Sequence, residues 1–578
     1  MIIEKEFEDF IFITALENAH KFGGKTQFKT LMGKAILKFP EMKEDMEFFK
    51  NKIDIILNQV NQMSLKDIEK KILEINPQFF VKTEKSKEKI ENNSLPPLPN
   101  LPAKMITRFA PAPSGHLHFG HIYNVVYNYE YAKQYDGKFI LRLEDTNPEN
   151  IELSNYNQII DDIKWLTDDG IDELFYQSDR IDIYYKYLRQ LIETGYAYVC
   201  ECEAEYFKNL NDSSKPCPHR NDEPNVQIQK YENFFNGKYK DGDAAIRFKG
   251  NLDDKNPALR DFPLARMVSK PHVRTKDKYK LWPMYNLCVS VDDALMGITY
   301  IIRGKDHEIN GIRQNMIKSA LNLRKAEFFH IGRIKFTDIE LSKTKLTEKI
   351  KNNEYQGWDD PRIPTVLSLK KKGYKALAIR KMIIAHGISK RDSKISEKEY
   401  FKQLDFFNKQ ILEKESNRYF CVINPKLVNI ENIGEYPVKE ILLPKHPDFK
   451  DKGFRKFELS KKYYISSIDF NNIKQGQNIR LMHFGNFNVK NINKDTIDLS
   501  FLSKEYDKNL KIENIIHFVP TEKNCEIEII LNNNQKIKAI AEDLKNIKED
   551  STVQFERFGF ARLDSKQNNK FVFYFTHR

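Results

Sequence analysis

Apolar side chains recur at helical spacing near the start of the chain. Two stretches keep the intervals of three and four residues that place side chains on one face of a helix: Phe10, Ile13, Leu16 and Ala19 form the first, and Ile53, Ile56, Leu57 and Val60 the second. Pro40 separates the two, because proline interrupts a helix. We therefore expect a helical N-terminal domain over residues 1–81, an accessory domain without a chemical motif.

A polar and proline-rich stretch then interrupts this pattern. Residues 82–93 are charged and polar, and residues 94–102 read SLPPLPNLP. Proline-rich segments favour an extended backbone and act as spacers. We therefore expect a linker over residues 82–103.

Short apolar strands alternate with helices after this linker. Residues 105–109 and 138–143 have the length and apolar character of strands, and residues 122–133 between them keep helical spacing. A strand, a helix and a second strand form the unit from which parallel sheets are built. This pattern predicts a Rossmann-like α/β domain over residues 104–345.

Helical spacing returns after residue 345 and gives way to strands after residue 415. Within the helical part, one face carries Ala376, Ile379, Met382 and Ile383. The last part contains four segments typical of strands: residues 462–468, 478–489, 526–530 and 571–576. We expect a helical subdomain over residues 346–415 and an antiparallel β-barrel region over residues 416–578.

Composition limits the class of protein. The chain has 578 residues, of which 40% are hydrophobic and 30% charged, as is typical of a globular protein with several domains. The charged residues Glu4, Lys5 and Glu6 argue against a signal peptide, and no run reaches the roughly 20 apolar residues that span a bilayer. We therefore expect a cytosolic protein that does not bind membranes. The net charge of +12 favours a polyanionic partner such as nucleic acid, although a composition rich in Lys, Asn and Ile is an alternative explanation.

A nucleotide-binding signature joins the first expected strand to its helix. Residues 108–121 read RFAPAPSGHLHFGH. The start of a helix offers free N–H groups and a positive dipole end, which suits a phosphate. Gly120 has no side chain, so a nucleotide ring could pack on the backbone. His118 and His121 lie one turn apart and can stabilise charge on a phosphate, either as imidazolium ions or as N–H donors. Taken alone, the histidines could equally be structural.

This string resembles the class I aminoacyl-tRNA synthetases. Residues 118–121 look like their His-Ile-Gly-His element with Phe119 in place of Ile, and the surrounding residues are characteristic of the glutamyl members. A second element, ELSKTKL at residues 340–346, resembles Lys-Met-Ser-Lys-Ser with Glu340 in its first position. The resemblance implies that Lys343, on a mobile loop, neutralises the pyrophosphate of ATP, with Lys345 as the alternative. It also implies an ATP site, used with Mg²⁺, that consists of Gly120, Ser342, Lys343 and Lys345.

Residues of the amino-acid pocket follow from the same resemblance. Glu144 comes at the carboxyl end of the second expected strand, where α/β sheets bind ligands, and would hold the ammonium group of the substrate. A surface acidic turn is the alternative for Glu144. Arg108 would bind the side-chain carboxylate of glutamate, and Tyr285 and Arg303 match positions that line the pocket. Glutaminyl enzymes carry a neutral residue in place of Arg303, so the two arginines favour glutamate.

Two further strings indicate the type of synthetase. GWDDPR at residues 357–362 and FGFARLD at residues 558–564 look like strings shared by glutaminyl enzymes and by glutamyl enzymes of archaeal or eukaryotic cytosolic type. The β-rich C-terminal region agrees with this group. The resemblance covers residues 105–578. It implies an insertion at about 198–285 that binds the acceptor end of tRNA, and a C-terminal region that reads the anticodon. Arg557, Phe558 and Phe560 are candidates there, although packing in the β-sheet core is the favoured alternative for each phenylalanine.

A cysteine and histidine cluster lies in the expected insertion. Its members are Cys200, Cys202, Cys217 and His219, two pairs separated by fourteen residues. Three thiolates and an imidazole suit tetrahedral zinc in a structural role. Reduced cysteines without a metal are the alternative.

The resemblance implies a monomer that activates L-glutamate with ATP and transfers it to the 3′ end of tRNA(Glu), and it leaves charging of tRNA(Gln) open. A glutaminyl enzyme is the nearest alternative. A synthetase-like RNA-binding protein without activity is a second alternative. A nucleotidyltransferase of the same fold is a third, but it would not need the β-rich residues from 416 onward.

Overall fold

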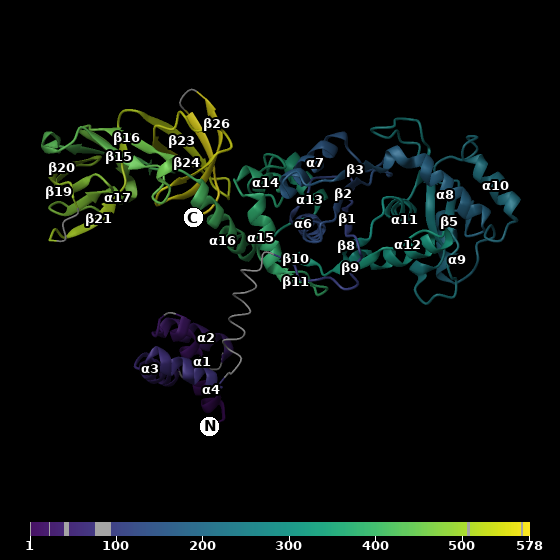
Figure 1. Ribbon diagram of the computed structural model, residues 1–578, viewed down its shortest axis with the longest axis horizontal. Coiled ribbons are helices and arrows are strands. Elements are labelled where there is room, and N and C mark those ends of the chain that lie inside the picture. Colours follow the sequence, from purple (N-terminus) through teal and green to yellow (C-terminus); the bar gives the residue numbers. More distant parts are fainter. Residues whose placement is uncertain (1, 22, 40–45, 76–93, 506–508, 568–569) are drawn as a thin grey trace. The chain divides into compact units, whose positions relative to one another are not determined.

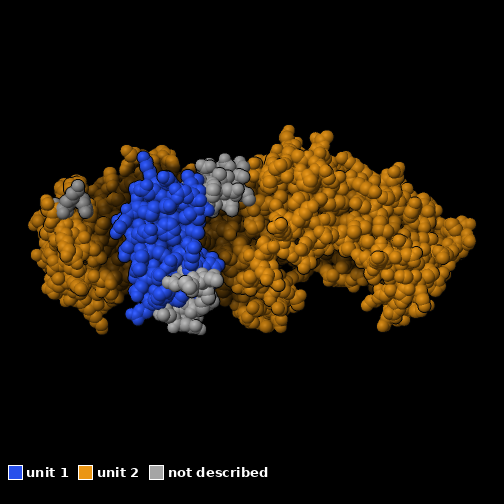
Figure 2. All heavy atoms as spheres, turned by 90° about the horizontal axis from the view of Figure 1, so that it is seen from below, with its two compact units in different colours: residues 1–93 blue, residues 94–578 orange. Residues whose placement is uncertain are grey.

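The computed structural model describes residues 2–21, 23–39, 46–75, 94–505, 509–567 and 570–578. The chain divides into two compact units, residues 1–93 and residues 94–578, shown in Figures 1 and 2. Within the described residues, no helix combines the length and the apolar character needed to cross a membrane.

Unit 1 is helical, as its spacing predicts. Its helices are α1 (Ile2–Lys21), α2 (Phe28–Lys38), α3 (Met46–Asn61) and α4 (Leu65–Ile75). On α3 the buried residues are among those predicted: Ile53, Ile56 and Val60. On α1 the buried stripe is shifted, because Phe7, Ile11, Ala15 and Ala19 recur every four residues while Phe10 and Ile13 are only partly buried. Pro40 lies outside the described residues.

A parallel sheet forms the centre of unit 2. Its strands β1 (Ile106–Phe109), β2 (Lys138–Leu143) and β3 (Glu173–Tyr176) pair in parallel, as do β8 (Tyr300–Gly304) and β9 (Glu327–Ile331). The two groups adjoin, because the Thr299 N–H donates to the Ile106 carbonyl at 3.0 Å. Helix α6 (Phe119–Gln134) connects β1 to β2. The predicted strand, helix and strand are therefore confirmed, and β1, β2 and β3 end at the same edge of the sheet because they run parallel.

The proline-rich segment belongs to this core. Leu95 and Leu98 are buried in it, and the Tyr131 hydroxyl donates to the Pro96 carbonyl at 2.8 Å. Residues 94–102 therefore pack on the core instead of forming a free spacer, because Leu95 and Leu98 are buried among apolar side chains of unit 2. Residues 82–93 of the expected linker lie outside the described part of the chain.

A second, antiparallel sheet lies between β3 and β8 in the sequence. It consists of β4 (Ala197–Cys200), β5 (Ala245–Phe248), β6 (Phe262–Met267) and β7 (Leu281–Pro283), in that order. The helices of this part of the chain are α8 (Ile181–Glu193), α9 (Ala204–Asp212) and α10 (Pro224–Asn233), whereas α7 (Leu153–Thr167) comes earlier, between β2 and β3. Helices α11 (Tyr285–Leu295) and α12 (Glu308–Ala320) then flank β8 along the chain.

Helices also dominate residues 343–415. They are α13 (Lys343–Lys351), α14 (Val366–Lys371), α15 (Ala376–His386) and α16 (Glu397–Glu415), with the short parallel pair β10 (Ile334–Phe336) and β11 (Ser393–Ile395). On α15 the buried residues include Ile379, Met382 and Ile383, as the helical spacing predicts.

The C-terminal region contains two seven-stranded sheets and a separate hairpin of β15 (Glu440–Pro444) and β16 (Phe454–Glu458). The first sheet runs from β12 (Arg418–Tyr419) through β25 (Thr552–Phe555), β26 (Gly559–Gln567), β27 (Lys570–Phe575), β23 (Asn524–Ile530) and β24 (Lys536–Glu542) to β13 (Cys421–Ile423). Its edge strands β12 and β13 are separated only by Phe420, so this sheet nearly closes on itself. Both seven-stranded sheets include parallel pairs, such as β23 with β27 and β14 with β20, so the expectation of purely antiparallel pairing is wrong.

The second sheet has the order β21 (Ile512–Ile516), β18 (Asn478–Leu481), β19 (Gly485–Ile492), β20 (Thr496–Ser503), β14 (Pro425–Ile430), β17 (Lys462–Ser466) and β22 (Val519–Pro520). Two of the predicted strands differ from the strands that the structure shows in this sheet. Residues 478–489 form a hairpin with His483 in a left-handed conformation at φ 59°, and the strand predicted to reach residue 468 ends where α17 (Ser467–Asn472) begins. Alternating apolar residues cannot distinguish one strand from two that are joined by a tight turn.

Candidate active site

One cavity of about 530 Å³ opens at the carboxyl ends of the central strands. It collects residues from seven separate places in the sequence. Seven of the predicted site residues line it: Arg108, His118, His121, Glu144, Tyr285, Arg303 and Lys343. Parallel strands bring these places together because their carboxyl ends share one edge of the sheet.

The two histidines close the first turn of α6. The Gly120 N–H donates to Nδ1 of His118 at 3.1 Å, and the His118 N–H donates to Nδ1 of His121 at 3.3 Å. Each Nδ1 is therefore an acceptor, so each ring carries its proton on Nε2. The rings stack with their centroids 3.8 Å apart. The pair forms a reciprocal cap, which fixes the orientation of both rings toward the cavity.

Burial decides the charge of these histidines. It lowers the pKa of His118 to about 4 and, together with the neighbouring His118, the pKa of His121 to about 3. Both imidazoles are neutral near pH 7, because their pKa values lie far below it. Of the two roles that the sequence allows, N–H donor and imidazolium ion, the structure supports the N–H donor.

Lys343 reaches the cavity from the first turn of α13, not from a loop as the resemblance implies. Its side chain lies across Gly115, where an added Cβ would come within 3.0 Å of the Lys343 Cδ. The ammonium lies 3.9 Å from a carboxylate oxygen of Glu152 and is half exposed. Lys343 and the two histidines therefore line one cavity, although more than 200 residues separate them in the sequence.

The other predicted ATP residues lie in different surroundings. Gly120 and Ser342 line a neighbouring hollow that shares both histidines with the cavity. A Cβ at Gly120 would lie 3.0 Å from the His118 ring, so glycine leaves room here for the histidine cap. Lys345 is 66% exposed and pairs with Glu340 at 3.0 Å, outside the residues that line the cavity.

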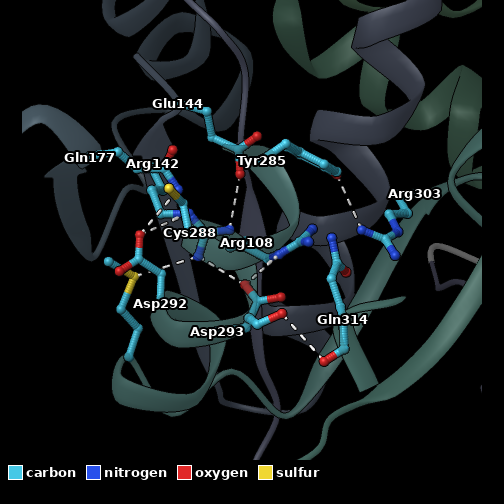
Figure 3. Close-up of polar contacts among 12 residues, drawn as sticks. Arg108, Arg142, Glu144, Gln177, Tyr285, Cys288, Asp292, Asp293, Arg303 and Gln314 are labelled. Carbon is cyan, nitrogen blue, oxygen red and sulfur yellow. Dashed lines mark hydrogen bonds and ion pairs between the residues drawn. The ribbon is translucent and has the colours of Figure 1, made fainter. Parts of the chain in front are cut away.

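Buried charges line the other end of the cavity. Asp293 Oδ1 accepts hydrogen bonds from Nε of Arg108 at 3.1 Å and from a terminal nitrogen of Arg142 at 2.8 Å (Figure 3). Burial favours the neutral acid, but the two arginines hold the pKa of Asp293 below its usual range. Glu144 accepts from Arg142 at 3.1 Å, and burial raises the pKa of Glu144 although both arginines oppose the shift. Glu144 is therefore only 11% exposed and lies at the site, so it is not a surface acidic turn.

Arg303 differs from Arg108 and Arg142, because it has no carboxylate partner in the part of the chain that the structure describes. Its guanidinium is 3% exposed and interacts with the Tyr285 hydroxyl and the His307 carbonyl, both at 3.3 Å. Its Nε has no hydrogen-bond partner, and no ion pair between Arg303 and a carboxylate occurs among the described residues. Burial lowers the pKa of Arg303 from its usual value. A buried guanidinium without an acidic partner, facing a cavity, is suited to bind an anion.

The cavity includes residues to which the sequence reasoning gave no role. Trp358, from the GWDDPR string, lies against His116 with ring centroids 4.8 Å apart, and both line the cavity. The string reaches this place because backbone hydrogen bonds connect the segment after it to the loop before α6: Phe119 N–H to Pro364 at 3.1 Å and Val366 N–H to Leu117 at 3.0 Å. The GWDDPR string could have indicated that Trp358 belongs to the site, but its resemblance was taken to indicate only the type of synthetase.

The predicted metal ligands lie together in the antiparallel part. One ligand atom from each of Cys200, Cys202, Cys217 and His219 fits within 4.8 Å, and Cys217 Sγ lies 3.5 and 3.4 Å from the other two sulfurs. Sulfurs that bind one tetrahedral zinc ion are roughly 3.8 Å apart, given Zn–S bonds of about 2.3 Å. The donor set and its spacing therefore fit zinc.

The candidate anticodon residues differ in exposure: Arg557 is exposed and Phe558 is half-buried. Phe560 is fully buried, and Arg557 pairs with Asp469 at 2.8 Å. Phe558 packs edge-on against Phe575. Phe560 therefore has the role in the β-sheet core that was the alternative for it.

Comparisons with known proteins agree with this arrangement. Three family models match: the catalytic domain of class I tRNA synthetases (E and Q) over residues 104–414, and two anticodon-binding domains of the same family over residues 416–507 and 504–564. Glutamate–tRNA ligases from Pyrococcus furiosus and Thermococcus onnurineus are each 39% identical to this chain, covering 99% of it and 100% of their own length. The corresponding ligase from Methanococcus maripaludis is 36% identical over 99% of this chain. The chain therefore belongs to the class I tRNA synthetases of the E and Q family, in the group of the archaeal glutamate–tRNA ligases.

Proposed function

We propose that this protein is a glutamate–tRNA ligase that forms glutamyl-adenylate from L-glutamate and ATP and transfers the glutamyl group to tRNA(Glu). The observation that carries the choice of amino acid is the buried Arg303, which faces the cavity without a carboxylate partner. A bound glutamate would supply one. Glutamine would leave the guanidinium unpaired, at a cost of roughly 3–5 kcal/mol.

The pocket offers a partner for each charged group of glutamate. Glu144 would accept the substrate ammonium, since it lines the cavity beside Tyr285. Arg108 and Arg303 would bind the side-chain carboxylate from two directions. Asp293 holds Arg108 through Nε, which leaves the terminal nitrogens of Arg108 for the substrate. This assignment requires that the α-carboxylate points toward the histidines.

Activation would then need only positioning and charge stabilisation. The α-carboxylate of glutamate attacks the α-phosphate of ATP, the bond to the bridging oxygen breaks, and pyrophosphate leaves. The Nε2–H groups of His118 and His121 would donate to the α-phosphate as charge develops on it. The ammonium of Lys343 would neutralise the leaving pyrophosphate. Mg²⁺ would enter on the phosphates of ATP.

One experiment tests this function against the nearest alternative. Aminoacylation of purified tRNA(Glu) and tRNA(Gln) would be measured with glutamate and with glutamine, each with ATP. We expect charging with glutamate of tRNA(Glu) at least. Charging with glutamine alone would identify a glutaminyl enzyme, and no charging at all would favour a synthetase-like RNA-binding protein.

The remaining assignments are proposals of the same kind. The Cys200 cluster would hold structural zinc, and the antiparallel insertion that contains it would bind the tRNA acceptor end. The C-terminal sheets would bind the anticodon. We propose a cytosolic monomer, with a helical accessory domain at its N-terminus. The domain boundaries at residues 104, 346 and 416 stay predictions.

A further inference from the structure

A buried lysine interacts with the charged end of the cavity, and the proposed mechanism does not use it. Lys318 on α12 is fully buried, and its Nζ has no hydrogen-bond partner among the described residues. It does not line the cavity. Lysine is almost never fully buried without a partner, because removing an ammonium ion from water is costly. A chain that keeps one here gains something from the charge.

The carboxylate that interacts most strongly with Lys318 is Asp293. Its Oδ1 holds both Arg108 and Arg142, while its Oδ2 has no hydrogen-bond partner. Gln314, one turn before Lys318 on α12, contacts the helix that carries Asp293, because its side-chain amide donates to Oδ1 of Asn286 on α11 at 3.3 Å. Residues four apart share a face of a helix, so Lys318 lies on the face of α12 that packs against α11.

The charges around the pocket do not balance. The cations of the connected cluster are Arg108, Arg142, Arg180, Arg303 and Lys318, and its carboxylates are Glu144, Asp292 and Asp293. Five cations against three carboxylates leave an excess of two positive charges. Glutamate carries a net charge of −1 near pH 7 and would lower this excess to one, whereas glutamine carries no net charge and would leave it at two. The cluster is therefore better matched to an acidic side chain than to an amide.

We propose that Lys318 is a specificity-determining positioning residue for the acidic amino acid. It stabilises the ionised form of Asp293, which orients Arg108, and it supplies one of the two excess charges that favour a side-chain carboxylate over an amide. This inference rests on the proposed function and concerns the residues beneath the same pocket.

The pH dependence of substrate binding follows from this role. Burial lowers the pKa of Lys318 to about 8; Asp293 on α11 opposes the shift, and Arg108 on β1, Arg142 on β2 and Arg303 on β8 add to it. The charged form is the one that favours glutamate. The affinity for glutamate should therefore be constant below pH 8 and fall as the pH rises through 8.

The test compares four proteins between pH 6.5 and 9: wild type, Lys318→Met, Lys318→Arg and the matched control Arg313→Met. Arg313 is on the same helix, but its Nε donates to Ala258 in the antiparallel part. The Michaelis constants for glutamate and ATP are measured by aminoacylation of tRNA(Glu). We expect Lys318→Met to raise KM for glutamate about tenfold below pH 8, because one unit charge near a bound carboxylate is worth a factor of this order. The kcat and the KM for ATP should change less than twofold.

The conservative variant separates charge from packing. Lys318→Arg should keep KM within about threefold of wild type and, because arginine stays charged, should remove the rise of KM above pH 8. An unchanged KM in Lys318→Met, or an equal increase in Arg313→Met, would overturn the inference. If Lys318→Met does not fold, wild type and Lys318→Arg are compared alone. The same pH dependence of the KM for glutamate in both would overturn the inference. Failure of the wild type to charge tRNA with glutamate would instead reject the proposed function.

Discussion

The His118 N–H donates to Nδ1 of His121 at 3.3 Å, so the backbone at the start of α6 decides which nitrogen of that ring carries the proton. The proton lies on Nε2, and burial lowers the pKa of His121 to about 3. The two rings thus act as a fixed pair of neutral donors at the end of the cavity that we assign to phosphate.

Because His118 and His121 are neutral near pH 7, we expect the rate of adenylation to be independent of their titration in this range. A ring that gains a proton, near pH 4 for His118, keeps its Nε2–H donor but loses the Nδ1 acceptor that fixes it in the helix cap. The rate of adenylate formation in wild type should therefore show no histidine titration between pH 5.5 and 8. His121→Asn should lower the rate on the order of 10²-fold at every pH in this range, through loss of one donor. A wild-type titration near pH 6.5 that disappears in His121→Asn would contradict the neutral form.

Gly120 is predicted to be needed for the histidine cap. A methyl group at this position would lie 3.0 Å from the His118 ring, which would have to move. Gly120→Ala should lower the rate of adenylation about tenfold, because the donor is displaced rather than removed. Gly33→Ala, in an open position on α2, is a matched control that should keep wild-type kinetics. Equal rates for wild type and Gly120→Ala would show that His118 needs no fixed orientation.

Substitution of Lys343 is predicted to lower the rate of adenylation much more than substitution of Lys345. Lys343 lines the cavity, whereas Lys345 is exposed and paired with Glu340. Lys343→Ala should lower pyrophosphate exchange into ATP on the order of 10²-fold with tRNA affinity near that of wild type. Lys345→Ala should have a clearly smaller effect. The reverse order would assign the role to Lys345.

Arg303 is predicted to act on the amino acid and not on ATP. Arg303→Cys should reduce kcat/KM for glutamate on the order of 10²-fold, since the bound carboxylate loses a buried partner. The KM for ATP should change little. Equal losses for glutamate and ATP would argue against Arg303 as a pocket residue.

The cysteine cluster is predicted to hold one zinc ion per chain. Metal analysis of the purified protein should find it, and a chelator should lower the melting temperature together with the zinc content, because the ion connects two segments of the insertion. Cys217→Ser should lose the metal, whereas Cys421→Ala, at a buried cysteine in the C-terminal sheets, should retain it. Stoichiometric zinc in Cys217→Ser would show that the cluster is not the site.

Local patterns along the chain were enough to predict several elements and motifs of this protein. The strands at residues 106–109 and 138–143, the helix between them and the residues of both nucleotide motifs follow from local patterns. Hydrophobic spacing and helix starts depend on near neighbours in the chain, so they can be predicted from the sequence. Arg303 was assigned to the pocket by the family resemblance, and its role in distinguishing glutamate from glutamine stays a prediction.

The contacts between distant residues and the charge states of buried groups could be seen only in the folded chain. Arg108 and Asp293 are 185 residues apart and meet through the order of the strands. Trp358 joins the cavity because its segment pairs with the loop before α6. The neutral state of the histidines and the buried charge of Lys318 depend on which side chains exclude water around them. Burial and interactions between charges are sums over residues distant in sequence, and no local pattern contains them.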